Sequence, residues 1–194
     1  MNSNELVKVI AENTSNRFIL GIDGLSRSGK TTLVKQLEDE LKQKDIPFHI
    51  FHIDDHIVER SKRYNTKHEE WYEYYQLQWD VEWLQQHLFH KLRLENQLNL
   101  PFYDHQTDFC EMREVIIPNP CVIVIEGVFL QRKEWREYFD YMVYLDYPRE
   151  QRFLRENEET QKNLLKFEHR YWKVEDFYLK VESPQQNADL VLKG

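Results

Sequence analysis

The amino-acid sequence predicts an α/β fold of three layers, in which a parallel sheet lies between two layers of helices. Two patterns along the 194 residues support this prediction. Apolar runs of strand length alternate with segments in which apolar residues recur every three to four positions, as in amphipathic helices. In addition, CVIVIEG (121–127) is apolar on successive residues, which is typical of a strand covered on both faces of a parallel sheet.

Each predicted strand is a short apolar run bounded by polar or turn-forming residues. RFILGID (17–23) leads into a group of glycines, and PFHIFHI (47–53) begins at Pro47, which cannot continue the helix before it. The segment 109–117 is expected to be an exposed strand. The predicted strands, in chain order, are 17–23, 47–53, 109–117, 121–127, 141–146 and 189–193.

Helices are predicted where apolar residues return every three or four positions. Leu33, Leu37 and Leu41 mark one such segment, and the same spacing recurs over 79–95. The predicted helices are 3–13, 30–44, 79–95 and several within the strongly charged segment 149–182.

Composition limits the class of protein. With 41% hydrophobic residues, the chain can bury the core of a single domain over 1–194, with the aromatic-rich segment 56–115 as an insertion. The net charge of −8 argues against nonspecific binding to nucleic acid or to an anionic membrane. No apolar run has membrane-spanning length, and Cys110 and Cys121 lack the spacing of a redox or zinc pair. A cytoplasmic protein is expected, and the sequence leaves a homo-oligomer open.

A group of glycines follows the first strand and marks a phosphate-binding loop. Glycines let backbone N–H groups close around phosphate oxygens at the N-terminus of the next helix. This chemistry assigns Lys30 to the β- and γ-phosphates of a nucleoside triphosphate and the Thr31 hydroxyl to Mg²⁺, and it predicts the fold of a P-loop NTPase. The residues that match G-x-x-x-x-G-K-[ST] are Gly24, Leu25, Ser26, Arg27, Ser28, Gly29, Lys30 and Thr31, followed by Thr32.

Acidic residues at two strand ends are candidates for the reaction. Asp54 and Asp55 come directly after the strand 47–53, and Glu126 ends the strand 121–127. Because ligands bind beyond the carboxyl ends of parallel strands, these carboxylates are expected to face the phosphate loop. One aspartate would then orient or deprotonate an acceptor hydroxyl and the other hold Mg²⁺ through water, while Glu126 would reach the metal. The alternatives are that the aspartates cap a helix and that Glu126 is incidental.

Basic residues recur every three positions after the strand 141–146. Arg149, Arg152 and Arg155 would lie along one side of a helix, and Arg170 follows further along the chain. Arginines at this position could close over a transferring phosphoryl group and neutralise its developing charge. The alternative is a solvated face whose arginines pair with the neighbouring glutamates.

Two other groups of side chains are assigned to structure rather than to chemistry. His49 and His52 have an odd spacing on a predicted strand, which sends them to opposite faces, so a shared metal site is not expected. The aromatic residues between positions 71 and 83 are expected in the core more than in stacking on a planar substrate.

Taken together, these motifs resemble the uridine kinase-like branch of P-loop kinases, which also includes nicotinamide riboside kinase, pantothenate kinase and phosphoribulokinase. The resemblance extends over about 18–192. The segments that carry it are GIDGLSRSGKTTL (21–33), HIDDHI (52–57), PFYDHQTD (101–108), VIVIEGVFL (122–130), YLDYPREQRFLRE (144–156) and NADLVL (187–192).

The resemblance implies a nucleoside-monophosphate-kinase-like (NMP-kinase-like) arrangement with a helical lid over 149–170 and an acceptor site beside 56–115. It implies that Asp54 is the catalytic aspartate, that Glu126 is the metal-side acid, and that Arg152 and Arg155 are lid arginines. It places Ala188 near the adenine. The residues expected on the acceptor side are Asp55, Asp80, Tyr103, Asp104 and Arg170.

Three segments depart from the uridine kinase pattern. His56 and Ile57 stand where those enzymes carry an aromatic pair, and Asp108 stands near the place of a base-reading histidine. YYQLQWD (74–80) replaces an HPDAFD-like run and leaves Asp80 as its acidic counterpart. These departures leave the residues for phosphoryl transfer in place and weaken the case for uridine itself.

The resulting hypothesis is ATP-dependent transfer of a γ-phosphate to a hydroxyl of a small molecule, with a nucleoside as the first candidate. A vitamin riboside, pantothenate or a sugar is the alternative acceptor. A second class of function is a switch-type or non-catalytic nucleotide-binding protein. A GTPase switch would need a guanine-reading N-K-x-D motif, which the chain lacks.

Overall fold

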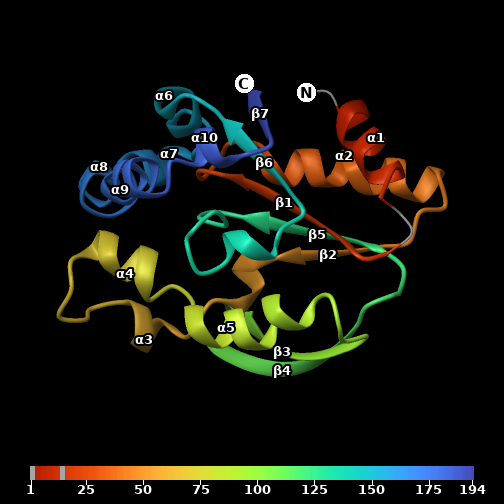
Figure 1. Cartoon of the computed structure of the whole chain (residues 1–194). Helices are drawn as coiled ribbons and strands as arrows, with labels where there is room; N and C mark the ends of the chain where they lie inside the picture. The colour runs from red at the N-terminus through yellow and green to blue at the C-terminus, as the bar shows by residue number, and fades with distance from the viewer. Residues whose placement is uncertain (1–2, 14–15) are drawn as a thin grey trace.

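A five-stranded parallel sheet forms the centre of the computed structural model, which describes residues 3–13 and 16–194 (Figure 1). Its strand order is β2-β5-β1-β6-β7, and each neighbouring pair is parallel. The strands are β1 (Phe18–Gly24), β2 (Phe48–His52), β5 (Val122–Gly127), β6 (Tyr141–Asp146) and β7 (Leu190–Lys193).

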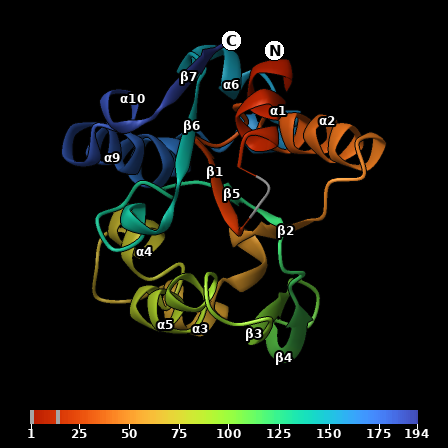
Figure 2. The ribbon, with the colours of Figure 1, turned by 45° about the vertical axis from the view of Figure 1, so that its right-hand side comes forward.

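Helices cover both faces of this sheet, because its strands alternate their side chains between two apolar cores. Leu20 and Val124 pack against α1 (Ser3–Ala11) and α2 (Lys30–Gln43), whereas Ile19 and Ile123 point to the opposite core. That second core includes side chains from α4 (Glu70–Gln76), α5 (Val81–His87) and α9 (Lys173–Glu182). Figure 2 shows the central sheet between these layers. The predicted three-layer α/β/α fold is confirmed.

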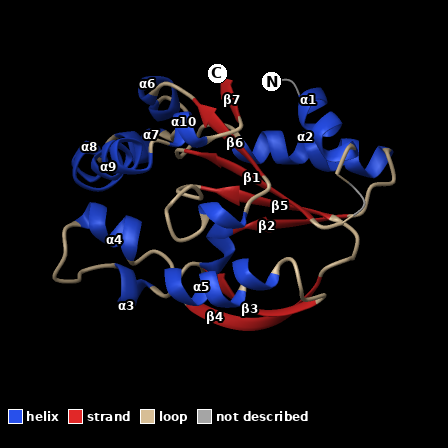
Figure 3. Ribbon diagram, in the orientation of Figure 1, coloured by secondary structure: helices blue, strands red, loops and turns tan. Residues whose placement is uncertain are grey.

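A separate antiparallel hairpin lies beside the second core (Figure 3). It consists of β3 (Gln97–Asp104) and β4 (Phe109–Ile116). The exposed strand over 109–117 was predicted, but β3 was not. Leu98 and Leu100 are buried between exposed neighbours, which is a strand pattern, and Pro101 obscured it in the sequence.

The predicted helix over 79–95 is wrong in its length. The structure ends α5 at His87 and continues with a 3₁₀ turn over Phe89–Lys91. The physical reason is tertiary packing: the Phe89 ring stacks on Trp135 at 5.1 Å between centroids, and Leu92 is fully buried beyond the turn. Apolar residues therefore keep the spacing of a helix beyond His87, although the backbone there is no longer α-helical.

The predicted helical character of 149–182 is confirmed, but the segment is broken into short pieces. Among the residues described, no helix has the length and apolar character needed to cross a membrane. The remaining elements are α3 (Arg60–Arg63), α6 (Arg149–Phe153), α7 (Glu158–Gln161), α8 (Leu164–Lys166), a π-helical turn over Phe167–Trp172, α10 (Pro184–Asn187) and 3₁₀ turns over Ile53–His56 and Arg136–Tyr138.

The strand directions place the candidate functional residues at one edge of the sheet. Because β1, β2 and β5 are parallel neighbours, the phosphate loop, the turn that carries Asp54 and the end of β5 with Glu126 follow from adjacent carboxyl ends. That the segments 56–115 and 149–170 act as an acceptor-side insertion and a lid stays a prediction.

Candidate functional site

The phosphate loop runs from Gly24 at the end of β1 to Lys30 at the start of α2. Gly29 has a φ of 99°, a left-handed conformation that favours glycine. A Cβ on Gly24 would lie 2.7 Å from the Ser28 hydroxyl and 3.0 Å from the Leu145 carbonyl oxygen. The backbone therefore turns too tightly for side chains at these two positions, as a loop that closes on phosphate requires.

Lys30 folds back over this loop. Its ammonium donates to the carbonyl oxygens of Gly24 at 2.9 Å and Leu25 at 3.2 Å, and the residue is 9% exposed. Burial lowers the pKa of Lys30, while the nearby carboxylates of Glu126, Asp23 and Asp54 act in the opposite direction. The structure thus brings the loop lysine close to both strand-end acids, as the sequence predicted.

Glu126 offers an unsatisfied oxygen at the end of β5. Its Oε1 is 2.7 Å from Nδ1 of His52, whereas its Oε2 is buried and has no hydrogen-bond partner within the described part of the chain. The carboxylate raises the pKa of His52 through this hydrogen bond. An unpaired buried carboxylate oxygen is costly unless a cation or donor binds it, so the site fits Mg²⁺.

The wider donor set also suits this cation. The described residues contain no group of three or more His, Cys, Asp or Glu side chains arranged to hold a metal ion. Magnesium bound to nucleotides usually takes one or two protein carboxylates and completes its shell with phosphate and water. Glu126, Asp54 and the hydroxyl of Thr31 are the oxygen donors that would hold Mg²⁺ here, and their role as ligands stays a prediction.

Asp54 lies in the 3₁₀ turn that follows β2, and its side chain is open to solvent. Desolvation of the Asp54 carboxylate by the surrounding protein raises its pKa, and the ammonium of Lys30 acts in the opposite direction. Neither Asp54 nor Asp55 caps this turn, because its N-cap is His52 and makes no side-chain cap bond. The capping part of that alternative is therefore wrong, although both aspartates do lie in the first turn of the 3₁₀ helix.

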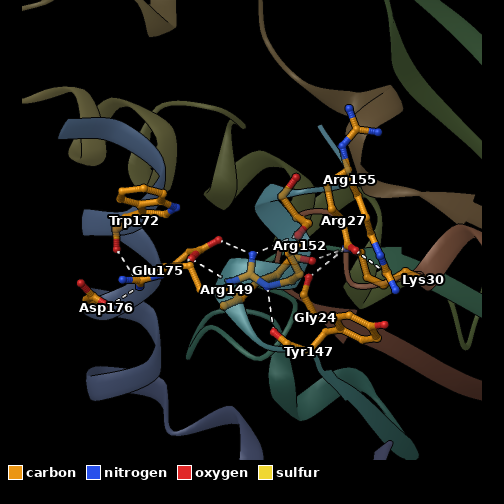
Figure 4. A network of polar contacts seen from close by, with 12 residues as sticks. Gly24, Arg27, Lys30, Tyr147, Arg149, Arg152, Arg155, Trp172, Glu175 and Asp176 are labelled. Atoms are coloured by element: carbon orange, nitrogen blue, oxygen red, sulfur yellow. Dashed lines mark hydrogen bonds and ion pairs between the residues drawn. The ribbon is translucent and has the colours of Figure 1, made fainter. Parts of the chain in front are cut away.

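Arg152 is the most heavily bonded of the predicted lid arginines (Figure 4). It forms a two-point pair with Glu175 of α9, at 2.6 and 2.9 Å, and is 5% exposed. It also donates to the backbone oxygens of Ser26, at 3.0 Å, and Tyr147, at 2.9 Å. The alternative of a solvated face is wrong for Arg152, which ties α6 to the phosphate loop and to α9.

The two neighbouring arginines are more accessible. Arg155 is exposed, donates to the carbonyl oxygen of Arg27 at 2.8 Å and lies 3.8 Å from the centroid of the Tyr147 ring. Arg149 pairs with Glu175 and Asp176 of α9. Both predicted lid arginines, Arg152 and Arg155, thus donate to the phosphate-loop backbone.

Arg170 lies in the π-helical turn and is almost completely buried. Its guanidinium carbon is 4.4 Å from the centroid of the Tyr64 ring and 5.2 Å from that of Tyr74. Its Nη1 donates to the carbonyl oxygen of Glu70 at 3.1 Å. The Tyr74 ring in turn lies near Asp54, whose charge contributes to a raised pKa of Tyr74 after the larger effect of burial. Arg170 is therefore packed against aromatic rings, and its place on the acceptor side stays a prediction.

The other predicted acceptor residues take local structural roles. The Tyr103 hydroxyl donates to Asp108 at 2.8 Å and accepts from Arg63 at 3.2 Å. Asp104 accepts from the Gln106 N–H and the Thr107 hydroxyl, which closes the β3–β4 turn.

Asp80 and Ala188 lie at element boundaries. The Asp80 carboxylate accepts from the N–H of Trp83 and thereby caps α5. Ala188 follows α10 and is half-buried. The roles of Asp80 and Ala188 in ligand binding stay predictions.

Comparison with known proteins decides the family. The sequence model of the Phosphoribulokinase / Uridine kinase family matches residues 19–191. The chain belongs to this family. The resemblance found in its motifs is thus confirmed over nearly the whole chain.

Individual members of the family differ in how much of this chain they match. A uridine kinase of Proteus mirabilis is 27% identical over 188 residues, covering 90% of this chain and 85% of that protein. A uridine kinase of Borrelia duttonii is 26% identical over 144 residues, and the match spans 64% of the length of that relative. A solved structure, described as a possible uridine kinase from Bacillus stearothermophilus, is 53% identical with a TM-score of 0.87 and covers 98% of this chain and 96% of its own.

Sequence reasoning missed one buried carboxylate of this family member. Asp23 is fully buried and accepts from the Leu130 N–H at 3.3 Å, the Gln131 side chain at 3.0 Å and the Tyr178 hydroxyl at 2.6 Å. Burial raises the pKa of Asp23, against these hydrogen bonds. The acidic residue at the end of the apolar run RFILGID was a signal that Asp23 needed such partners.

Proposed function

We propose that this chain is an ATP-dependent phosphotransferase that moves the γ-phosphate of ATP to a hydroxyl group of a small molecule. The observation that carries the proposal is the convergence of Lys30, Asp54 and Glu126 at the mouth of the phosphate loop. Membership of the Phosphoribulokinase / Uridine kinase family supports the same reaction class.

Each residue has a distinct role in the proposed reaction. The loop N–H groups and Lys30 bind the phosphates, and Asp54 accepts the proton of the acceptor hydroxyl. The acceptor oxygen then bonds to the γ-phosphorus as the bond to the bridging β,γ-oxygen breaks and ADP leaves. Glu126 and Thr31 would hold Mg²⁺, which would supply positive charge beside the phosphate oxygens.

The lid arginines support this geometry in different ways. Arg155 is exposed beside the loop and can turn its guanidinium toward a bound phosphate. Arg152, which Glu175 already holds, keeps the Ser26 carbonyl and hence the loop in position. Catalysis of this kind depends mainly on positioning and on electrostatic stabilisation.

The favoured acceptor is a nucleoside. The names of the Proteus and Borrelia relatives, both uridine kinases, support this class. Asp108 replaces the expected base-reading histidine and is bonded to the Tyr103 hydroxyl and the Arg60 N–H. The Asp108 carboxylate would accept a hydrogen bond from an N–H or O–H group of the substrate. A vitamin riboside, pantothenate or a sugar is therefore the alternative substrate.

An acceptor screen tests the proposal. Purified protein with Mg·ATP is given a panel of nucleosides, vitamin ribosides, pantothenate and sugars, and ADP release is followed by a coupled assay. The expected result is ADP release that depends on one acceptor class, with the phosphorylated product seen by mass spectrometry. ADP release that no acceptor changes would instead indicate a switch or a simple ATPase.

A further inference from the structure

Among the described residues, the one side-chain hydrogen bond of Glu126 comes from the adjacent strand β2. His52 is the last residue of β2 and stands directly opposite Glu126 in the parallel pairing of β2 with β5. Residues that are paired in this way point to the same face of the sheet. The imidazole Nδ1 therefore reaches Glu126 Oε1, at 2.7 Å, without any change in the backbone.

This contact gives the two oxygens of the Glu126 carboxylate different environments. Oε1 is held by the imidazole, whereas Oε2 is buried and has no hydrogen-bond partner among the described residues. A carboxylate with one oxygen fixed cannot rotate freely, so Oε2 keeps one direction. Metal ligands are commonly oriented by such outer partners.

Packing in the core does not account for the position of the His52 imidazole. The His52 side chain is 41% exposed, against 10% for that of Glu126, so it contributes little to the core. Within the described part of the chain, Glu126 is its one hydrogen-bond partner. Lys30 offers the carboxylate a competing partner, because it lies near enough for Glu126 to raise its pKa against the larger effect of burial. Without His52, Glu126 would be free to turn toward that ammonium.

We propose that His52 is a positioning residue for the metal-side acid: it holds Glu126 Oε1 so that Oε2 stays directed toward the divalent cation that enters with the nucleotide. The proposal rests on the proposed function, in which Glu126 contacts that cation. His52 itself touches neither the cation nor the substrate in this role. Its removal should weaken cation binding rather than nucleotide binding.

Three variants separate positioning from packing. His52→Phe keeps a ring but removes the donor, and His52→Asn restores an amide nitrogen on Cγ, where Nδ1 is attached in histidine. His49→Phe is the matched control, because His49 is on the same strand with an odd spacing and makes ring contact with Phe51 at 4.5 Å. If His52→Phe fails to fold, as judged by circular dichroism, His52→Ala replaces it.

The measurement is Mn²⁺ binding to the protein with a non-hydrolysable ATP analogue, followed by electron paramagnetic resonance at pH 7.5. For His52→Phe we expect a dissociation constant for Mn²⁺ about tenfold or more above that of the wild type. His52→Asn should recover most of the loss, and His49→Phe should stay within about twofold of wild type. Affinity for the metal-free analogue should be unchanged in all three variants.

Two results would overturn the proposal: wild-type Mn²⁺ affinity in His52→Phe, or an affinity in His52→Asn no better than in His52→Phe. Glu126→Gln in the same assay separates this failure from failure of the proposed function. If Glu126→Gln binds Mn²⁺ as the wild type does, the metal-side role of Glu126 is wrong, and the proposal falls with it. If Glu126→Gln weakens binding but His52→Phe does not, only the positioning role fails.

Discussion

Arg152 and Glu175 form a buried two-point ion pair that joins α6 to α9 beside the phosphate loop (Figure 4). Both side chains are only 6% exposed, and the same guanidinium donates to the carbonyl oxygen of Ser26. A second contact, the hydrogen bond from the Tyr178 hydroxyl to Asp23, joins α9 to the strand before the loop. Side chains of α9 therefore help to position both the phosphate loop and the strand that leads into it.

We expect Glu175→Gln to destabilise the protein strongly. The substitution leaves the Arg152 guanidinium buried without a balancing charge, which typically costs about 3 to 5 kcal/mol. Urea denaturation followed by circular dichroism measures the loss. Asp176→Asn is the control on the same helix, because the Asp176 side chain is 65% exposed and its pair with Arg149 should contribute less than about 1 kcal/mol. Equal effects of the two substitutions would contradict the structural role given to the buried pair.

Asp54→Asn should abolish most of the turnover but leave ATP bound. Loss of a general base typically lowers the rate about 100- to 10,000-fold, whereas the phosphate loop and Lys30 are untouched. The acceptor found in the screen gives kcat, and a fluorescent ATP analogue gives the affinity. Asp39→Asn, on the exposed side of α2, serves as the control. A kcat near that of the wild type in Asp54→Asn would remove this residue from the mechanism.

Tyr178→Phe should lower the free energy of unfolding by disrupting the hydrogen bonds around Asp23, which precedes the phosphate loop. Its hydroxyl donates to Asp23 at 2.6 Å and accepts from the Gln131 N–H at 3.1 Å, so its loss leaves a buried donor and a buried carboxylate under-bonded. The expected cost is about 1 to 3 kcal/mol in the free energy of unfolding. Tyr72→Phe, at a half-buried tyrosine, should change that free energy by less than about 0.5 kcal/mol. Thermal denaturation of both variants compares them, and a neutral Tyr178→Phe would speak against the network.

His49 should make the fold sensitive to mild acid. Burial lowers its pKa below the ordinary value of 6.5. As the pH falls through 6.5 toward the lower folded pKa, the unfolded chain takes up a proton that the folded protein does not, so stability is lost in that window and is fully present above it. His49→Phe should therefore lose less stability than the wild type between about pH 7 and pH 5.5 in urea titrations. Parallel pH dependences of the two proteins would contradict this account.

The strands of the sheet and the phosphate loop could be predicted because local sequence decides them. CVIVIEG must be a strand buried on both faces, since its apolar residues have no polar alternation. The phosphate loop needs glycine at Gly24 and Gly29 for reasons of backbone geometry alone. Asp54 and Glu126 could be placed beside it because parallel strands end at the same edge.

Two local predictions failed where packing outweighed periodicity. The period of 79–95 indicated one helix, but the stacking of Phe89 on Trp135 tightens the chain into a 3₁₀ turn. The strand β3 was not predicted, because Pro101 lowers strand propensity, yet pairing with β4 is retained across it.

The partners of the candidate site were decided by the tertiary structure alone. His52 meets Glu126 across 74 positions of the chain, Arg152 meets Glu175 across 23, and Asp23 meets Tyr178 across 155. The sequence by itself determined the layers, the phosphate loop and the strand ends that carry acids, because each depends on residues close together in the chain. It could not determine which oxygen of Glu126 is held or what holds Arg152, because those contacts exist only once strand order and helix packing bring distant residues within hydrogen-bond distance.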